Sequence, residues 1–278
     1  PDDLDDAGAG FEQATGEQTT AGMLRPFARG ITLPAQVCTG TVSVAHKAIN
    51  LRITETDDAT RLVATAPAGK GSLTGAIEID ISVAKPAGHE SLNVLIPWSE
   101  RTFQFTSKHN TRPATGTVRV GGRSWAVAAE SDAWGVQDLG RGIWPYSNRW
   151  NWASASGHGT DGRLLGLQFG GKWTIGTGAT ENALCIDGRL TKISDELEWT
   201  SDWANPMAPW RVRTPGSDQV DATLTPSFDR YDVTDLKVLR MEVHQCFGTW
   251  AGRVVGDDGV PVSFEGVRGF AEEARNKW

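Results

Sequence analysis

The segment "IEIDISV", residues 77–83, decides the fold class of this 278-residue chain. Apolar side chains stand at every second position from Ile77 to Val83, and polar side chains fill the positions between them. Such alternation is typical of a strand with one buried face and one wet face, as in antiparallel sheets. Residues 49–54 repeat the pattern as "INLRIT". The sequence therefore predicts an antiparallel all-β structure, either a barrel or a pair of barrels.

Glycine-containing turns separate several of these alternating segments and predict β-hairpins. The turns are Gly121-Gly122, Gly170-Gly171, Asp187-Gly188 and Asp258-Gly259. Loops of these compositions allow the positive φ angles that tight hairpin turns need. Helical periodicity occurs convincingly only in "GFAEEARNKW", residues 269–278, which predicts a short C-terminal helix.

A long segment rich in tryptophan, "DLGRGIWPYSNRWNWASASGHG" (residues 138–159), is punctuated by glycine and proline. This composition predicts a long ordered loop, and such loops in compact domains tend to be functional. We expect a domain boundary near residue 137, with an N-terminal β domain over 1–137 and a C-terminal β-barrel domain over 138–278. Residues 1–36 begin with an acidic stretch rich in glycine and threonine, and predict a mobile arm or loop.

The composition excludes several classes of protein. With 39% hydrophobic and 22% charged residues the chain is an ordinary globular protein, and its net charge of −7 argues against nonspecific binding to nucleic acid or anionic membranes. Its apolar runs are too short to span a membrane.

The three cysteines, Cys38, Cys185 and Cys246, are too few for a disulfide framework and favour a reducing compartment, so we expect a cytoplasmic location. The chain opens at Pro1 rather than Met, and we expect its natural N-terminus to be missing.

Asp138, at the head of the tryptophan-rich segment, has two possible roles. It can pair with Arg141 and hold the segment in place. Alternatively, apolar walls can keep its carboxyl protonated, so that it donates a proton to an alkene or carbonyl, and we take it as the first choice of acid. A nearby guanidinium would lower the Asp138 pKa. Arg141 would then orient an anionic or carbonyl substrate, and the acid–base role would pass to Glu181 or His244.

The other polar candidates also have alternative roles. Glu181 and Asn182 follow a glycine run, where they form either an acid with an orienting amide or a carboxylate held by backbone amides. His244 lies on an alternating segment, as a core histidine or as a base near neutral pH. Gln245 would face the opposite way on a regular strand.

Lys108 and His109 form the last polar candidate group. Lys108 is expected to keep its ammonium in solvent; if buried, it needs Asp138 or Glu181 as partner. Five histidines without metal-ligand spacing make a transition-metal site unexpected, and we expect neither a metal nor any cofactor.

The aromatic side chains of the tryptophan-rich segment are dense enough to form a pocket wall, although core packing is the alternative. Their faces would stabilise a developing cation by about 1–2 kcal/mol each in a dry site. The predicted catalytic residues are thus Asp138, Glu181 and His244. The predicted substrate-binding residues are Arg141, Trp144, Tyr146, Trp150, Trp152, Asn182, Lys108 and Gln245.

Long segments of the chain together resemble the bacterial and fungal family known as domain of unknown function 2804. They are "LNVLIPWSERTFQFTSKHNTRPATGTV" (92–118), "DLGRGIWPYSNRWNWASASG" (138–157), "GATENALCIDGRL" (178–190), "HQCFGTWAGRV" (244–254) and "GVRGFAEEARNKW" (266–278). The resemblance covers roughly residues 24 to 278. It implies a lipocalin-like architecture of two β-barrel-like units, similar to carotenoid 1,2-hydratases, AttH-like proteins and some fungal Diels–Alderases. Family members usually carry further residues before this region, so the first unit is expected to be incomplete.

Three functions remain open at this point. The first is a cofactor-independent acid–base enzyme, of the hydratase, cyclase or isomerase type, acting on an isoprenoid- or polyketide-like molecule in a tryptophan-lined pocket. The second is a carrier that binds a hydrophobic ligand without turnover, and the third is a carbohydrate-binding protein. The expected partner is a small molecule, and the sequence does not indicate the oligomeric state.

Overall fold

A computed structural model describes residues 9–12, 17–22 and 30–277 of the chain. Part of the predicted arm or loop over 1–36 therefore lies outside the described residues, and the described part contains the short strands β1 (Ala9–Glu12), β2 (Glu17–Thr20) and β3 (Ile31–Thr32). The all-β prediction is confirmed, and the described residues contain a single 3₁₀ turn, η2 (Ala129–Ser131), but no α-helix. The chain divides into two compact units, one formed by residues 1–87 and 112–135 and the other by residues 88–111 and 136–278. The chain therefore passes between the units three times.

The first unit contains most of an eleven-stranded sheet, whose main path runs β10-β9-β7-β6-β5-β4-β3 with antiparallel neighbours. The predicted strands over 49–54 and 77–83 are confirmed as β5 and β7, and the Gly121-Gly122 turn joins β9 to β10. The strands of this path and the attached pair β1 and β2 are β1 (Ala9–Glu12), β2 (Glu17–Thr20), β3 (Ile31–Thr32), β4 (Gly40–His46), β5 (Ile49–Glu55), β6 (Ala59–Gly71), β7 (Gly75–Ala84), β9 (Phe103–Val120) and β10 (Arg123–Val127).

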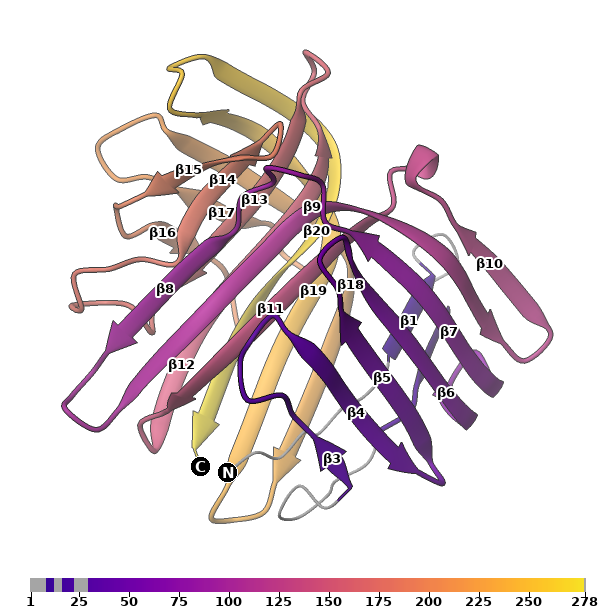
Figure 1. Ribbon diagram of the computed structural model, residues 1–278. Coiled ribbons are helices and arrows are strands. Elements are labelled where there is room, and N and C mark those ends of the chain that lie inside the picture. Colours follow the sequence, from indigo (N-terminus) through magenta and orange to yellow (C-terminus); the bar gives the residue numbers. More distant parts are fainter. Residues whose placement is uncertain (1–8, 13–16, 23–29, 278) are drawn as a thin grey trace. The chain divides into compact units, whose positions relative to one another are not determined.

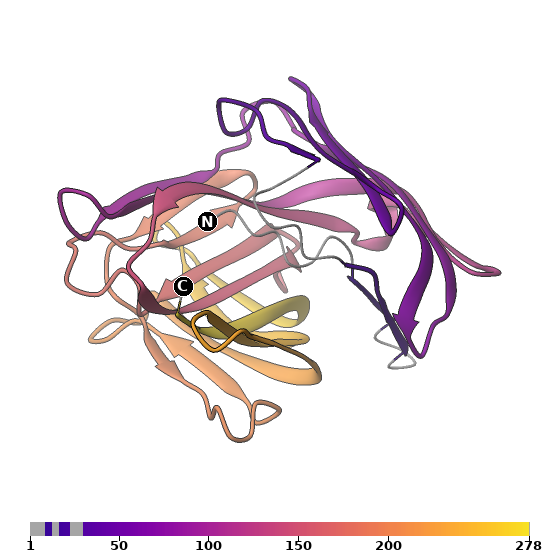
Figure 2. The same cartoon turned by 90° about the horizontal axis from the view of Figure 1, so that it is seen from below.

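The second unit contains a nine-stranded antiparallel sheet in the order β15-β14-β13-β12-β20-β19-β18-β17-β16. The sheet curls around a core in which Trp210, Trp250 and Phe169 are almost completely buried (Figure 2). Figure 1 shows the long strands β18, β19 and β20 side by side. The nine strands are β12 (Ser147–His158), β13 (Leu164–Gly171), β14 (Asn182–Ile186), β15 (Arg189–Ile193), β16 (Glu198–Thr200), β17 (Trp210–Arg213), β18 (Val220–Asp235), β19 (Arg240–Val255) and β20 (Pro261–Lys277).

A second layer of the same unit covers the other face of this sheet. It consists of β8 (Leu92–Pro97), the first half of β9 and most of β11 (Trp134–Ile143), and both β8 and β11 pair with β9. Asn110 on β9 donates from Nδ2 to the carbonyl of Leu167, and the backbone N–H of Thr111 donates to Ser156 Oγ. The nine-stranded sheet thus has a filled core on one face and a polar layer on the other.

The tryptophan-rich segment was predicted as a loop, which is wrong. It forms the second half of β11 and all of β12, with a connection of only residues 144–146 between them. On β12, Ala153 and Ala155 enter the core, while Trp150 and Trp152 lie on the opposite face. Because both faces of this strand are covered, apolar residues fill both and the two-residue alternation disappears from the sequence.

Two further predictions are also wrong. Residues 269–278 were predicted as a helix, yet β20 runs to Lys277 between β12 and β19. Its two faces are both buried near residues 270–274, so apolar side chains fall at spacings that imitate a helix.

Gly170-Gly171 does not form the turn of a hairpin, since β13 pairs with β12 and β14 and the residues after Gly171 form turns. The hairpins at Asp187-Gly188 and Asp258-Gly259 are confirmed.

The three cysteines are free; Cys185 and Cys246 are buried, and Cys38 is partly exposed. Among the described residues, no helix combines the length and the hydropathy of a membrane span.

Candidate functional site

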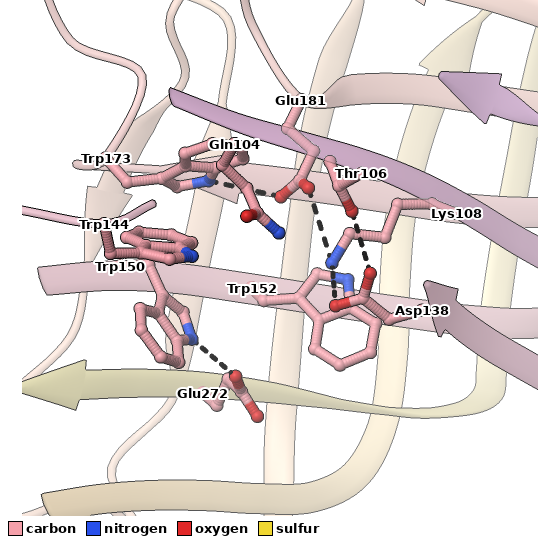
Figure 3. A pocket seen from close by; sticks show the side chains of 10 residues that line it. All are labelled: Gln104, Thr106, Lys108, Asp138, Trp144, Trp150, Trp152, Trp173, Glu181 and Glu272. Atoms are coloured by element: carbon pink, nitrogen blue, oxygen red, sulfur yellow. Dashed lines mark hydrogen bonds and ion pairs between the residues drawn. The ribbon is translucent and has the colours of Figure 1, made fainter. Parts of the chain in front are cut away.

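A cavity of about 330 Å³ lies in the second unit, against the face of the nine-stranded sheet that β9 and β11 cover (Figure 3). Its wall combines four indoles with three carboxyl groups and one ammonium group. The lining residues are Gln104, Thr106, Lys108, Asp138, Trp144, Trp150, Trp152, Trp173, Glu181 and Glu272.

Strand β9 contributes three polar side chains to the wall. Gln104, Thr106 and Lys108 are spaced two residues apart, so the strand places them on one face. The expectation that the Lys108 ammonium is solvated is wrong, because only 6% of its side chain is exposed. The carboxylate partner that a buried Lys108 would need is present, and both expected candidates supply it.

The Lys108 ammonium lies between Asp138 and Glu181. Its Nζ is 2.7 Å from Asp138 Oδ2 and 3.4 Å from Glu181 Oε1, and it stands 3.9 Å from the ring centroid of Trp152. Thr106 donates its hydroxyl to the other Asp138 oxygen at 2.8 Å. Burial alone would lower the pKa of Lys108, but the negative charges of Glu181 and Asp138 outweigh it and raise that pKa above its usual value. Lys108 is therefore positively charged at neutral pH.

Glu181 immediately precedes β14, and its side chain is only 3% exposed. Trp173 donates from Nε1 to Glu181 Oε2 at 3.3 Å. Burial is the main influence on this carboxyl and raises its pKa to about 7; the attraction of Lys108 opposes the rise, and the negative charge of Asp138 adds to it. A methyl group at Gly170 would come within 2.7 Å of the Glu181 side chain, so the absence of a side chain at residue 170 makes room for the carboxyl.

Glu272, on β20, is a third carboxyl of the wall and is also buried. Both of its oxygens accept a hydrogen bond of 2.8 Å, one from Trp150 Nε1 and the other from Gln245 Nε2. Burial raises the Glu272 pKa above its usual value, although these two hydrogen bonds and the charge of Lys108 act in the opposite direction. The two donors fix the orientation of the carboxyl group.

The indoles of the wall pack against one another. Trp144, in the short connection after β11, has ring centroids of Trp98, Trp150 and Trp173 within 4.8–5.5 Å, all at tilted angles. Trp98 donates from Nε1 to the carbonyl of Trp173 at 2.9 Å. This arrangement encloses one side of the cavity with ring faces and edges instead of one flat platform.

Some of the predicted site residues lie away from the cavity wall. Arg141 is exposed and is three residues from Asp138 on β11, so the alternation of the strand directs the two side chains to opposite faces. Tyr146 is 60% exposed and donates its hydroxyl to the carbonyl of Val238. His244 bonds through Nδ1 to Asp229 at 2.7 Å.

Other predicted residues support the site from nearby. Asn182 accepts a hydrogen bond from the N–H of Gly170 and donates to the carbonyl of Asp195, which ties β14 to its surroundings. Gln245 reaches Glu272, whereas His244 faces the other side of β19, as the alternation predicts. His109 makes a 2.9 Å hydrogen bond with Ser107 instead of entering the cavity wall.

Four residues of the cavity wall were not predicted as site residues: Gln104, Thr106, Trp173 and Glu272. The first two carried a usable signal, since they precede Lys108 at spacings of four and two residues on a strand. Trp173 and Glu272 were concealed by a wrong hairpin and a wrong helix. In the part of the chain that the structure describes, no three histidine, cysteine or acidic side chains form a group that could hold a metal ion.

Comparison with known proteins gives a family and several distant structures. The profile of the family described as "Domain of unknown function (DUF2804)" matches residues 9–278. No curated protein matches the chain in sequence. Similar solved structures include kievitone hydratase from Nectria haematococca, with 11% identity, a TM-score of 0.44, and coverage of 99% of this chain and 82% of that chain. CghA with Sch210972 has 11% identity, a TM-score of 0.41, and coverage of 98% and 85%.

Proposed function

The chain belongs to the family described as Domain of unknown function (DUF2804), and we propose that it is an acid–base enzyme that protonates a compact, unsaturated, apolar substrate. The observation that supports this proposal is Glu181, a buried carboxyl group with a pKa of about 7 in the wall of an indole-lined cavity. A general acid works best when its pKa is close to the working pH, because both protonation states are then accessible.

Glu181 is a better proton donor than Asp138, the first choice from the sequence. The Asp138 carboxylate already accepts from the Lys108 ammonium and the Thr106 hydroxyl, which makes it the acceptor of an ion pair. Glu181 has the more distant contact with Lys108, at 3.4 Å. After it loses its proton, the new carboxylate is stabilised by that ammonium and by the N–H of Trp173.

The chemical step is a proton transfer from Glu181 to a substrate carbon. A C–H bond forms with the electrons of a carbon–carbon π bond, and the neighbouring carbon becomes a cation. Indole faces and the fixed carboxyl of Glu272 stabilise this cation. Water that adds to the cation and gives its extra proton to the Glu181 carboxylate completes a hydration. Attack by a second π bond moves the cation to another carbon, and loss of a proton from the neighbouring carbon to Glu181 completes a cyclisation. Direct loss of a proton from a carbon next to the first cation completes an isomerisation.

The size of the cavity limits the substrate. Ligand pockets span about 300–1,000 Å³, and this one, at about 330 Å³, lies at the small end. We therefore propose a compact isoprenoid- or polyketide-like molecule, or the compact reacting end of a longer one. No cofactor takes part in the step as written.

The two other candidate functions receive less support. A carrier of apolar ligands needs no buried ionisable groups, which are costly to desolvate, yet Lys108, Glu181 and Glu272 are all buried in this wall. A carbohydrate-binding site uses an exposed aromatic platform, whereas the indoles here tilt against one another by 37–58°.

Incubation in D₂O with a library of small unsaturated apolar molecules tests the proposal. We expect at least one library member to gain carbon-bound deuterium or the mass of D₂O, as measured by mass spectrometry. The Glu181→Gln variant should lower that rate at least a hundredfold, because the amide keeps the shape and removes the transferable proton. Glu78→Gln, in the first unit, changes an exposed carboxylate and should leave the rate unchanged.

Two outcomes would overturn the proposal. If the protein binds library members, as followed by tryptophan fluorescence, but returns all of them chemically unchanged, it is a carrier. If turnover occurs and Glu181→Gln supports the wild-type rate, the acid is another group.

A further inference from the structure

A second charged cluster lies on the other face of the nine-stranded sheet. Its centre is the buried carboxylate of Glu273 on β20, which contacts three cations. Arg149 Nη2 is 2.9 Å from Glu273 Oε1, Lys172 Nζ is 2.6 Å from Oε2, and Arg275 Nε is 2.8 Å from Oε1. We call these four residues the Glu273 cluster.

Alternation along the strands separates this cluster from the cavity. Arg149 on β12 and Glu273 on β20 are each next to a residue of the cavity wall on the same strand, namely Trp150 and Glu272, and Lys172 joins them from the turn after β13 through its contact with Glu273. Neighbouring residues on a strand point to opposite faces. The Glu273 cluster is therefore a separate site, and its assignment does not depend on the proposed function of the cavity.

The Glu273 cluster carries more positive charge than its carboxylate can neutralise. Although burial acts against it, hydrogen bonds from Lys172, Arg149 and Arg275 lower the pKa of Glu273 to about 2, so it contributes one negative charge at neutral pH. The cations contribute three positive charges, and among the described residues they have no ion-pair partner besides Glu273. The formal balance is +2.

The excess positive charge affects the pKa of Lys172. An ion pair ordinarily raises the pKa of a lysine. Here the Lys172 pKa is lowered despite the contact with Glu273, first by burial and also by repulsion from Arg149 and Arg275. A bound anion would relieve this repulsion.

We propose that the Glu273 cluster is a binding site for a compact oxyanion, either inorganic phosphate or the phosphate or carboxylate end of a larger molecule. The cations have unused N–H donors, because Arg149 uses one terminal nitrogen and Arg275 uses Nε for Glu273. Their side chains are 54%, 31% and 37% exposed for Arg149, Lys172 and Arg275, so an anion can reach these donors.

The surroundings limit what else the ligand carries. The core of the sheet is filled by fully buried side chains such as Trp210 and Trp250, so no channel behind the cluster is expected to hold a long apolar tail. The guanidinium of Arg275 stacks 3.8 Å from the ring centroid of Trp203. A ligand larger than phosphate would thus lie over the surface near Trp203.

Isothermal titration calorimetry with inorganic phosphate, phenyl phosphate and benzyl alcohol tests this site on the full chain. We expect both phosphates to bind, with affinity that falls as sodium chloride is added, and benzyl alcohol to show no binding. Equal affinity for the two phosphates identifies a site for the free ion, whereas tenfold tighter phenyl phosphate identifies the end of a larger molecule.

Matched variants assign the binding to the cluster. Lys172 has a positive φ of 70°, as does Lys237 with 69°, and glycine adopts both conformations without strain. Lys172→Gly should weaken phosphate at least fivefold, and Lys237→Gly should have no effect. Glu273→Gln removes the competing negative charge and should tighten binding, which a purely structural role of Glu273 does not predict.

The proposal is overturned if neither phosphate binds the wild-type protein at 20 mM. It is also overturned if Lys172→Gly and Arg149→Ala both bind phosphate as tightly as the wild type.

Discussion

Lys108 and Glu181 face each other in the cavity wall as a buried ammonium and a buried carboxyl group, with Nζ and Oε1 3.4 Å apart. The contact holds the pKa of Glu181 below the value that burial alone would give it. The strength of the proposed acid is thus set by a balance between burial, which raises the pKa of Glu181, and its neighbours, among which the Lys108 ammonium has the largest opposing effect.

Replacing Lys108 with Met should raise the pKa of Glu181 above about 7, because the ammonium is lost while the burial remains. NMR titration of side-chain carboxyl carbons in labelled protein measures this pKa directly. Lys237→Met, at an exposed turn, is the control and should leave the titration unchanged. A Glu181 pKa that stays constant or falls in Lys108→Met would show that the ammonium does not act on this carboxyl.

The ionisation of Glu181 should lower the free energy of unfolding as the pH is raised from 4.5 to 7. Its pKa is about 7 in the folded state against an ordinary value of 4.5, so in this range the folded state binds the proton more tightly than the unfolded state. The free energy of unfolding therefore falls as pH rises through this window, by roughly 3 kcal/mol from this residue, and levels off above pH 7.

Urea unfolding of the wild type and Glu181→Gln at pH 5, 6, 7 and 8 measures this contribution. Glutamine cannot ionise, so the variant should gain stability relative to the wild type as pH rises. Parallel stability curves for the two proteins would contradict the raised pKa of Glu181.

A cationic ligand should bind the cavity better than a neutral ligand of the same shape. Phenyltrimethylammonium and tert-butylbenzene form such a pair, and the ammonium imitates a tertiary carbocation beside ring faces and carboxylates. We expect the ammonium to bind at least tenfold more tightly at pH 8, and to weaken at pH 6, where Glu181 becomes neutral. Tryptophan fluorescence titration gives both affinities. Equal affinities at pH 8 would argue that the cavity is not built for a cation.

A methyl group at Gly170 should displace the proposed acid without unfolding the protein. In Gly170→Ala the new carbon would lie 2.7 Å from both Cβ and a carboxyl oxygen of Glu181, so the Glu181 side chain must shift from its position. We expect a cost of about 1–3 kcal/mol in stability and at least a tenfold loss of turnover. Gly122→Ala, where nothing lies within 4 Å of the new carbon, is the control. Wild-type turnover in Gly170→Ala would mean that the position of Glu181 is not critical.

The sequence predicts those parts of the fold that depend on neighbouring residues. Alternation over residues 77–83 is a local property of one half-buried strand, and the turn at Asp187-Gly188 joins strands adjacent in sequence. The alternation is lost in β12 and β20, which are covered on both faces by elements distant in the chain. Their tryptophans and glutamates consequently suggested a loop and a helix.

The sequence indicated which acidic side chains belong to the candidate site, but not which residues they contact. Asp138 and Glu181 stood out as acids, and both line the cavity. Arg141 is close to Asp138 in the sequence and was therefore the expected ion-pair partner. The Asp138 carboxylate instead pairs with Lys108, thirty residues away, because β11 pairs with β9. Strand pairing over such separations leaves no local mark in the sequence.

Glu272 and Glu273 are adjacent on β20, so the register of this strand decides which carboxyl group faces the cavity and which faces the Glu273 cluster. Glu272 stands opposite Trp152 and Gln245 in the ladders, and Glu273 stands opposite Asn151 and His244. One residue inserted between Gly266 and Phe270 would rotate the rest of the strand by half a period, exchanging the two carboxylates and turning Phe270 into the core. Two inserted residues would restore the faces. The turn at residues 257–259 lies outside the ladder, and its length can change without altering either site.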